Sequence, residues 1–448
     1  MDRIIAIALD LGTTSIKVGA MNEFHNFEIL QVTSAPKLKH NKLSVTGDPY
    51  AYLDKVIQLL DQVKAYTPLD CPLSITSQRS SFVVWDSKTG EALSPIISWQ
   101  DRDVPTENNI YNPVDFSQKT GLIFSPYYFG LKLSYWFYKN PGIKKDNIKS
   151  GTLDTWIIWK LSQGQHHITD DSMAARTGLY NIQQFNWDEH LLNFYTIPKS
   201  CLPKIVSSKS LNISLNKNFV IKSISADQSA SLIGLDLRPG DININIGTGA
   251  FALRENAQGQ KTPKNYQNAL LYKDKNANFC SEGAIHGLTQ TLQKFNIAWE
   301  DFKLTQNKNF CCPDSSGIGA PYWKSTSEFL STHSSFQQLS MNEKQSCFIK
   351  GLAFRIQEII DDLKNHQSKI ILTGGRAQHP QLLRLLSHMN ENLFISSHQE
   401  STCIGALKLG GYDIQKNEPS RIEFCDSPAT KSEFLLWKSW LHKALKSL

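Results

Sequence analysis

The sequence predicts a two-domain α/β protein. Its 448 residues exceed the roughly 100–200 residues of a typical domain, so two large domains are expected. Stretches with the alternating polarity of strands are interspersed with stretches whose apolar residues recur at helical spacing. A pair of hairpins with similar glycine–threonine turns, one in each half, indicates an internal repeat. We place the domains at residues 1–236 and 237–448.

Composition narrows the class of protein. The chain is 40% apolar and 20% charged, and its net charge of +6 forms no block, so no nucleic-acid partner is expected. The eight cysteines include no C-x-x-C pair, which favours reduced thiols over a zinc site or disulfide framework. No stretch reaches the roughly 18 apolar residues of a membrane span. The first apolar run is too short for a signal peptide, and we expect a cytoplasmic protein.

The first hairpin, residues 4–21, carries the chemistry of a phosphate site. An apolar run ends at Asp10, and a turn follows through Gly12, Thr13 and Thr14. Gly12 allows close approach of the backbone, and two hydroxyls lie beside backbone N–H groups. Asp10 can hold a divalent cation that bridges phosphates. An ordinary hairpin with an Asx turn is the alternative.

The second hairpin, residues 241–254, repeats this pattern around Gly247 and Thr248. Two such turns, one from each half, would face each other across a cleft and grip one polyphosphate from both sides. A chance pair of hairpins is the alternative.

The rest of the first half predicts strands at 26–33 and 73–77 and a helix at 51–66. Arg79 and Trp99 follow strand ends, where ligands bind in α/β folds. Trp99 can equally be a core aromatic.

Three further segments of this half carry aromatic or ionisable residues. Tyr127 lies at a turn before a helix, where its hydroxyl can reach a cleft or its ring can pack at an interface. Residues 151–161 predict an amphipathic helix. The pair His166 and His167 is expected in a solvated turn, because no metal ligands follow at useful spacing. Asp227 begins a helix of small residues, either as a base kept ionised by the helix dipole or as a cap.

The second half continues with a glycine–proline turn at 317–323 and a capping box formed by Ser340 and Glu343. The helix behind the capping box is expected to bury one stripe, consisting of Phe348, Leu352, Ile356, Ile359 and Leu363.

The last segments are a strand, a turn and a helix. The strand at 369–373 ends in Gly374 and Gly375, where a flat ring can lie against the backbone or a simple tight turn can form. The helix at 434–448 is expected to pack on the core rather than on a membrane surface.

Several motifs together resemble one family, the carbohydrate kinases of the glycerol kinase and xylulokinase type (FGGY kinases), and within it the glycerol kinases. The matches run in order along nearly the whole chain, which makes them specific as a set. They are LDLGTTSIK, QRSSFVVWDSKTGE, SWQDRD, GTLDTWIIWKLSQGQHHITD, ADQSASLIG, GTGAFAL, GIGAPYW and LTGGR.

The resemblance implies two actin-like, RNase H-like domains around a central nucleotide cleft. It implies Mg²⁺ with ATP as the phosphoryl donor and a small polyol or sugar as acceptor, with glycerol converted to glycerol 3-phosphate as the first expectation. A homodimer or homotetramer is also typical of the family.

The same resemblance implies roles for individual residues. Asp227 stands at the catalytic base and Asp10 at the metal position. The substrate positions are Arg79, Ser80, Trp99, Tyr127, Asp227, Gln228 and Phe251. The ATP positions are Thr13, Thr14, Lys17, Gly247, Thr248, Gly317, Gly374 and Gly375.

Four residues depart from the glycerol kinase pattern, and among them Ser125 stands in place of an aspartate and Tyr135 in place of a tryptophan. Ser80 replaces a glutamate, and Lys17 replaces an arginine, which keeps the charge but loses the planar fork. Ser80 leaves room for a longer acceptor, so a kinase of a four- to seven-carbon polyol or ketose (erythritol, ribulose, xylulose or sedoheptulose) stays open. A degenerate member that only binds nucleotide is the remaining alternative.

Overall fold

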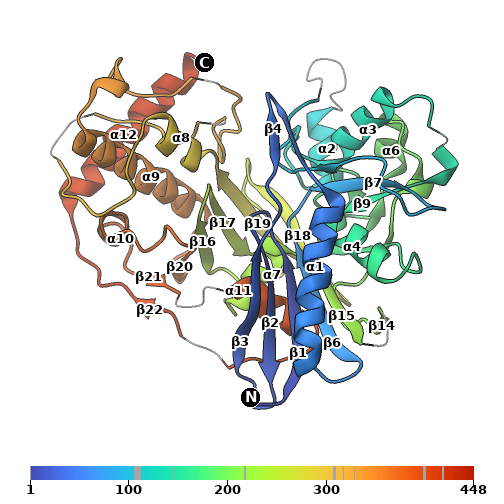
Figure 1. Cartoon of the computed structure of the whole chain (residues 1–448). Coiled ribbons are helices and arrows are strands. Elements are labelled where there is room, and N and C mark those ends of the chain that lie inside the picture. Colours follow the sequence, from blue (N-terminus) through green and yellow to red (C-terminus); the bar gives the residue numbers. More distant parts are fainter. Residues whose placement is uncertain are drawn as a thin grey trace. The chain divides into compact units, whose positions relative to one another are not determined.

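The computed structural model divides into two compact units (Figure 1). Unit 1 comprises Met1–Asp236, Ala269–Phe279 and Glu400–Lys416, and unit 2 comprises Leu237–Asn268, Cys280–Gln399 and Asn417–Leu448. The second half of the sequence therefore contributes two segments to unit 1. The described residues are 2–104, 112–143, 145–215, 218–305, 309–315, 317–326, 328–396, 400–415 and 418–448.

The central sheet of unit 1 has the strand order β14-β15-β6-β1-β2-β3. Its strands are β1 (Ile4–Leu11), β2 (Ser15–Asn22), β3 (Phe27–Ser34), β6 (Cys71–Ser77), β14 (Ile213–Ser214) and β15 (Phe219–Ala226). Strands β1, β2 and β3 form an antiparallel meander, whereas β6 runs parallel to β1 and to β15. The predicted first hairpin, third strand and strand near 73–77 are confirmed.

Alternating residues of β1 face two different layers, because successive strand side chains point to opposite faces. Ile7 and Leu9 belong to the core that includes α1 (Pro49–Val63) and α4 (Leu153–Leu161). Ala6 and Ala8 belong to the core that includes α11 (Ser401–Leu409). Asp10 continues this second series, so the alternation directs its carboxylate toward the α11 face.

Helices α7 (Asp227–Gly234) and α11 pack closely in unit 1. A Cβ atom on Gly405 would lie 1.7 Å from the Ala230 carbonyl oxygen, and one on Gly234 would lie 1.9 Å from the Ser401 oxygen. Only glycine at these positions permits the two backbones to approach so closely. The close packing brings the start of α11 to the same edge of the sheet as Asp10.

The remainder of unit 1 contains a second sheet of order β4-β5-β8-β7-β9 and two small sheets, β10-β13 and β11-β12. The strands are β4 (Lys39–Asn41), β5 (Ser44–Gly47), β7 (Phe82–Asp86), β8 (Ile96–Ile97), β9 (Ile148–Thr152), β10 (Ile168–Asp170), β11 (Tyr180–Asn181), β12 (Asn186–Trp187) and β13 (Lys204–Val206). The other helices are α2 (Pro113–Thr120), α3 (Phe129–Lys139), α5 (Asp171–Ala174) and α6 (Glu189–Phe194), with 3₁₀ turns at Lys64–Tyr66, Lys145–Asn147 and Lys199–Cys201.

Two local predictions in this region are wrong. Residues 151–152 end strand β9, and α4 is buried at every position from Leu153 to Ile158 instead of being amphipathic. The reason is that α4 contacts strands of both sheets of unit 1. His167 is half-buried rather than solvated, because its Nε2 lies 3.0 Å from the Ser150 carbonyl oxygen and its ring packs edge-on against Trp85.

Unit 2 is built on a sheet of order β18-β19-β17-β16-β20-β21-β22. Its strands are β16 (Ile242–Ile246), β17 (Ala250–Glu255), β18 (Gln267–Lys273), β19 (Ala277–Ile285), β20 (Ile370–Thr373), β21 (Leu393–Ile395) and β22 (Ser420–Arg421). Its helices are α8 (Leu288–Lys294), α9 (Met341–Leu363), α10 (Pro380–Ser387) and α12 (Pro428–Lys446), with a 3₁₀ turn at Phe336–Gln338. The tip of the β18–β19 hairpin belongs to unit 1. The predicted second hairpin is confirmed as β16 and β17.

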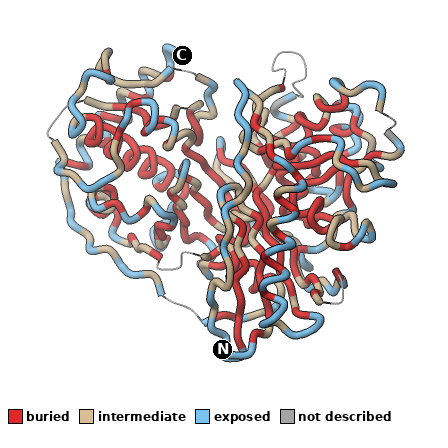
Figure 2. Tube along the Cα trace, in the orientation of Figure 1, coloured by how far each residue is buried: buried red, intermediate tan, exposed pale blue. Residues whose placement is uncertain are grey.

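Helix α9 is the centre of the unit 2 core. The predicted capping box is present, since Ser340 Oγ accepts from the Glu343 N–H and the Glu343 carboxylate accepts from the Ser340 N–H. The helix is buried all round from Lys344 to Ile360 rather than along one stripe, because strands cover one side and α10 and α12 the other (Figure 2).

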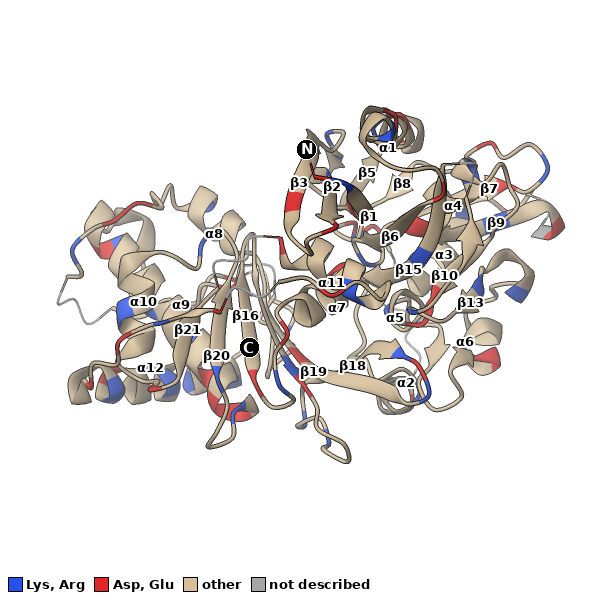
Figure 3. Ribbon diagram, turned by 90° about the horizontal axis from the view of Figure 1, so that it is seen from below, with Lys and Arg blue, Asp and Glu red and all other residues tan. Residues whose placement is uncertain are grey.

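The C-terminal helix α12 packs on the core, as predicted. Phe434 and Trp437 contact the ring of Phe354 of α9, and Leu441 belongs to the same apolar cluster. Among the described residues, no helix is long and apolar enough to cross a membrane. Lysine and arginine side chains are scattered over many elements of each unit and do not gather on one (Figure 3).

Candidate active site

Hydrogen bonds to the Gly12 carbonyl oxygen fix the turn of the first hairpin. The Gly12 oxygen accepts hydrogen bonds from the Tyr52 hydroxyl at 2.8 Å and from Gln78 Nε2 at 3.1 Å. A Cβ atom on Gly12 would lie 2.6 Å from the Ser15 carbonyl oxygen, which is closer than real Cβ contacts allow. Gly12 is therefore required by the tight turn itself.

Thr13 connects this turn to Trp99. The Thr13 hydroxyl donates to Gln78 Oε1 at 2.9 Å and accepts from Trp99 Nε1 at 3.0 Å. The Trp99 backbone N–H donates to Ser81 Oγ, which in turn donates to Gln78 Oε1, both at 2.9 Å. Trp99 is partly exposed, so it is a fixed surface side chain beside the turn and not a core aromatic. Gln78 and Ser81 are members of this network that the sequence reasoning missed.

Asp10 lies among like charges. It is paired across the hairpin with Lys17, whose ammonium contacts both carboxylate oxygens of Glu400, at 2.8 and 2.7 Å. Burial raises the pKa of Asp10 to about 7; the charge of Asp227 raises it further, Lys17 lowers it, and Glu400 has the smallest effect and raises it. Glu400 immediately precedes α11, far from Lys17 in sequence, and no sequence signal identified it.

Asp227 is the first residue of α7, and the N-cap position belongs to Ala226. Asp227 is therefore not the N-cap residue of α7, and the alternative that it serves as the cap is wrong. Asp227 Oδ1 accepts from the Gln228 N–H at 2.7 Å and lies 3.6 Å from Arg79 Nε. The Asp227 side chain is 29% exposed, so its carboxylate is accessible. Gln228 Oε1 is buried and accepts no hydrogen bond from a described residue.

Two further predicted substrate residues lie in unit 1. Ser80 is 7% exposed, has a left-handed φ of 65°, and donates from its hydroxyl to the Arg176 carbonyl oxygen at 3.1 Å. Left-handed backbone is unfavourable for a residue with a Cβ, and such strain is typical of functional sites. Tyr127 is partly exposed, with the Arg102 guanidinium 4.7 Å from its ring centre.

In unit 2, Arg376 fastens the turn of the second hairpin. Its Nη1 donates to the Gly247 carbonyl oxygen at 2.7 Å and to Thr289 Oγ1 at 2.8 Å. Thr248 is exposed at the tip of the turn. The motif LTGGR contains Arg376, but the sequence reasoning assigned it no role.

The two glycines after β20, Gly374 and Gly375, differ in whether the surrounding atoms would leave room for a side chain. Gly374 has φ 90°, and a Cβ atom there would lie 2.5 Å from both Asn245 Oδ1 and the Ile246 oxygen. The tight-turn alternative therefore explains Gly374, whereas a Cβ on Gly375 would meet no atom within 4 Å. Gly317, with φ 86°, and the partly buried Phe251 complete the predicted residues of unit 2.

Within unit 1 the structure thus pairs Thr13 with Trp99 and Arg79 with Asp227, and Asp10 lies near enough to Asp227 to feel its charge. Within unit 2 it joins the Gly247 turn to Arg376, which follows β20. Among the described residues, no group of three or more His, Cys, Asp or Glu side chains is arranged to hold a metal ion.

Comparison with known proteins supplies the context of these two groups. Models of the FGGY family of carbohydrate kinases match the chain, the N-terminal domain over residues 5–234 and the C-terminal domain over residues 242–414. The glycerol kinase of Mycoplasmopsis pulmonis is 29% identical, with 97% of this chain and 96% of the relative covered. That of Streptococcus pneumoniae is 28% identical, with 76% and 75% covered.

Solved structures share the fold. Plasmodium falciparum glycerol kinase with ADP superposes with a TM-score of 0.79 at 23% identity, covering 99% of this chain and 98% of that one. A ligand-bound xylulose kinase from Lactobacillus acidophilus gives 0.82 at 19% identity, covering 98% of each. A gluconate kinase from the same organism gives 0.82 at 18% identity, again covering 98% of each.

Proposed function

We propose that this chain, which belongs to the FGGY family of carbohydrate kinases, phosphorylates glycerol at a terminal hydroxyl to form glycerol 3-phosphate. Family membership makes the chain an ATP-dependent phosphotransferase that acts on a small sugar or polyol, with the two-domain α/β fold of its solved relatives. Glycerol is the specific part of the proposal. Its support is that the curated relatives named above are glycerol kinases.

The observation that carries the proposal is the pairing of Arg79 with Asp227 at 3.6 Å in the same unit as the anchored Trp99. A guanidinium donates hydrogen bonds to acceptor hydroxyls and favours the ionised form of the carboxylate. An indole face provides apolar contact for the carbon chain of a polyol. Tyr127, Gln228 and Phe251 are proposed as further acceptor contacts.

In the proposed mechanism, Asp227 orients the attacking hydroxyl and accepts its proton. Phosphoryl-transfer transition states tend to be loose, so a carboxylate of ordinary basicity suffices as the base. Arg79, whose Nε lies 3.6 Å from Asp227 Oδ1, would hold this carboxylate in a fixed direction. Acceptor binding against Trp99 limits the orientations from which the hydroxyl can attack.

Asp10 fits the role of a carboxylate for Mg²⁺. In kinase sites this ion takes one or two protein carboxylates and completes its coordination with phosphates and water, so a single aspartate without a dense ligand cluster is consistent. Burial is the main cause of the raised pKa of Asp10, and the charge of Asp227 adds to it; a divalent cation would offset both effects. When bound, Mg²⁺ would neutralise charge on the transferring phosphoryl group.

The nucleotide residues are proposed from both units. Thr14, Lys17 and the backbone N–H of Thr13 would contact phosphate oxygens from the first turn, because the Thr13 hydroxyl is already engaged by Gln78 and Trp99. Gly247 and Thr248 would contribute from the second turn. Gly317, Gly374 and Gly375 are proposed to lie near the nucleotide.

A second candidate is a kinase of a longer polyol or ketose. Ser80 favours it, because its short side chain is directed to the Arg176 oxygen and offers no carboxylate to a glycerol hydroxyl. A lost hydrogen bond to a charged group costs roughly 1.5–3 kcal/mol, or about 10- to 150-fold in affinity. The fold neighbours named xylulose kinase and gluconate kinase are consistent with this candidate.

An acceptor panel separates the candidates. Purified protein with MgATP is supplied with glycerol, erythritol, ribulose, xylulose or sedoheptulose, and ADP release is measured. Glycerol with the highest kcat/KM supports the proposal, and a ketose with the highest value replaces it with the second candidate. ATP binding without transfer to any member would identify a degenerate nucleotide-binding protein.

A further inference from the structure

The short helix α5 contacts strand β15, which ends one residue before the proposed base. On one edge, β15 pairs with β6 as far as Ala226. On the other edge, the described residues of β14 pair only with residues 220 and 221 of β15. The Ala226 N–H donates to Ser172 Oγ of α5 at 2.9 Å. A side chain therefore completes the hydrogen bonding at the strand end, where a buried backbone N–H needs a partner.

The Ser172 hydroxyl is an acceptor with a fixed orientation. It carries one proton, which it donates to Asp170 Oδ2 at 2.6 Å. A hydrogen bond to an ionised carboxylate is about twice as strong as one between neutral groups. Asp170 therefore keeps the hydroxyl proton directed away from Ala226, and the Ser172 oxygen is left to accept from the Ala226 N–H.

Asp170 has more hydrogen bonds than helix capping requires. It is fully buried and is the N-cap residue of α5, where its carboxylate accepts from the Ser172 and Met173 N–H groups at 2.9 and 3.0 Å. A cap needs only these backbone donors. The same carboxylate also accepts from the hydroxyls of Ser172 and Ser208, both at 2.6 Å. Capping alone does not explain the two hydroxyl donors.

The turn after α5 reaches the other member of the Arg79–Asp227 pair. The Arg176 carbonyl oxygen accepts from the Ser80 hydroxyl at 3.1 Å, and Ser80 immediately follows Arg79. Ser80 has a left-handed φ of 65°, a conformation that persists only where the surroundings hold it. Residues 170–176 thus hold the chain next to Asp227 at one end and the chain next to Arg79 at the other.

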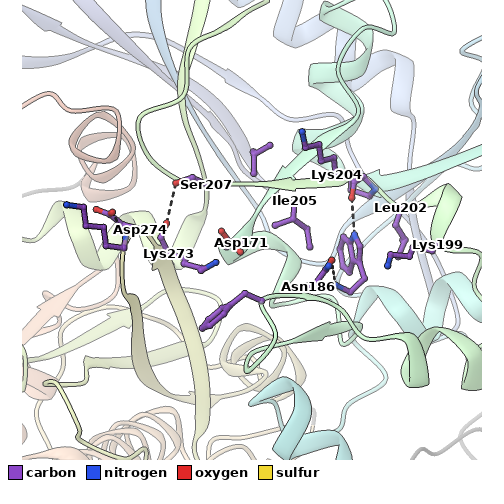
Figure 4. A pocket seen from close by; sticks show the side chains of 14 residues that line it. Asp171, Asn186, Lys199, Leu202, Lys204, Ile205, Ser207, Lys273 and Asp274 are labelled. Atoms are coloured by element: carbon purple, nitrogen blue, oxygen red, sulfur yellow. Dashed lines mark hydrogen bonds between the residues drawn. The ribbon is translucent and has the colours of Figure 1, made fainter.

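The hydroxyls that fix Asp170 are buried behind the wall of a cavity. Figure 4 shows Asp171 and Ser207 on the wall of this cavity, whose volume is about 810 Å³. Their chain neighbours Ser172 and Ser208 are fully buried and donate to Asp170 instead. Water in the cavity therefore does not reach these hydrogen bonds, and the low local dielectric strengthens them.

We propose that Ser172, held by Asp170, is a positioning residue for the reaction. By fixing the Ala226 N–H it sets the start of α7, and with it the direction in which the Asp227 carboxylate meets the acceptor hydroxyl. Ser172 is fully buried, so it acts through Asp227 and not by contact with a ligand. The inference rests on the proposed role of Asp227 as the base. Misplacement of a reacting group by about 1 Å can cost about 10²-fold in rate.

Ser172→Ala and Ser208→Ala form a matched pair, because each removes one hydroxyl donor from Asp170 and only Ser172 contacts Ala226. With the panel's best acceptor, Ser172→Ala should lower kcat about 10- to 100-fold and change the KM for ATP by less than about twofold. Ser208→Ala should lower kcat by about threefold or less. Ser172→Thr, which keeps the hydroxyl, should recover most of the turnover. Equal losses in the two alanine variants overturn the proposal.

A double-variant cycle separates positioning from general damage to the fold. If Ser172 acts through Asp227, Asp227→Asn/Ser172→Ala should turn over within about twofold of Asp227→Asn, because the group that Ser172 positions has already lost its role. Losses that multiply would make Ser172 a purely structural residue and overturn the proposal. Ser172→Cys, which offers only a weak hydrogen-bonding group, takes the place of the alanine variant in both measurements if that variant does not fold.

The same measurements distinguish failure of this inference from failure of the proposed function. Near-normal turnover of Asp227→Asn, or no transfer by the wild type to any acceptor, refutes the proposed base and the inference with it. Strong loss in Asp227→Asn together with equal effects of Ser172→Ala and Ser208→Ala leaves the base in place and refutes only the positioning role of Ser172.

Discussion

Replacing Thr13 by valine tests whether the Thr13 hydroxyl acts on the acceptor, by positioning Trp99, or on the phosphates of ATP. Valine keeps the shape of threonine but removes the hydroxyl that donates to Gln78 Oε1 and accepts from Trp99 Nε1. Each neutral hydrogen bond contributes about 0.5–1.5 kcal/mol. Gln78 Oε1 keeps the Ser81 hydroxyl as a donor, so most of the loss falls on the position of the indole. A loss of about 0.5–1.5 kcal/mol at Trp99 corresponds to a KM for the acceptor raised about 2- to 13-fold.

Steady-state kinetics with each substrate varied at saturating concentration of the other measures this effect. The matched variant is Thr14→Val, because Thr14 is exposed and the hydrogen bond that it accepts from the Ala35 N–H uses its carbonyl oxygen. We expect Thr14→Val to leave the acceptor KM nearly unchanged. If Thr13→Val raises the KM for ATP and leaves that for the acceptor unchanged, the Thr13 hydroxyl acts on phosphate and the hydrogen-bond argument is refuted.

Three other perturbations have defined outcomes. Asp227→Asn should lower kcat by about 10²- to 10⁴-fold while ATP still binds, because the base is lost and the nucleotide contacts remain. Arg355→Met should lower the free energy of unfolding by about 3–5 kcal/mol in urea titrations. It leaves the buried Asp314 carboxylate, 3.1 Å from the guanidinium, without this cation, and it takes from the buried Glu358 carboxylate its contact at 2.7 Å, so that Lys438 at 3.9 Å and His442 at 3.6 Å remain. Burial lowers the pKa of His167 to about 4 from 6.5, so the unfolded chain binds more protons between these values, and stability should fall by up to about 3 kcal/mol as pH decreases from 6.5 to 4.

Each of these has a control. Near-normal turnover of Asp227→Asn would remove this carboxylate from the mechanism. For Arg355, the triple replacement of the ion-pair group by apolar residues should recover much of the lost stability, and a single variant as stable as the wild type would contradict the desolvation argument. His167→Gln should flatten the pH dependence of unfolding between 4 and 6.5, and an unchanged slope would assign that dependence to other groups.

Short sequence patterns were sufficient to predict the elements that are stabilised by contacts between residues close in sequence, and the hairpin that occurs twice. The alternating runs around Gly12 and Gly247 predict both hairpins. Two such runs that flank a short glycine turn can do little else than pair with each other as antiparallel strands. The capping box at Ser340 and Glu343 is likewise a short-range hydrogen-bond exchange that any sequence window contains. Asp227 could be predicted as a candidate because it marks the passage from a buried strand to a helix.

Burial of whole helices could not be predicted in the same way. The segment 151–161 was expected to be amphipathic, and α9 was expected to bury one stripe, yet both are covered on most sides. How many faces a helix buries depends on the number of layers around it, which is a property of the assembled unit. His167 follows the same reasoning, because its partner is the backbone of a strand in another sheet.

The sequence by itself determined the family, the two glycine–threonine turns and the identity of most candidate residues, because these depend on residue types at short spacing. Only the tertiary structure decided that Glu400 neutralises Lys17, that Thr13 and Gln78 hold Trp99, and that the Ser172 hydroxyl of α5 accepts from the Ala226 N–H just before α7. Each of these contacts joins residues distant in sequence, and their pairing follows from how strands and helices stack, which no local pattern encodes.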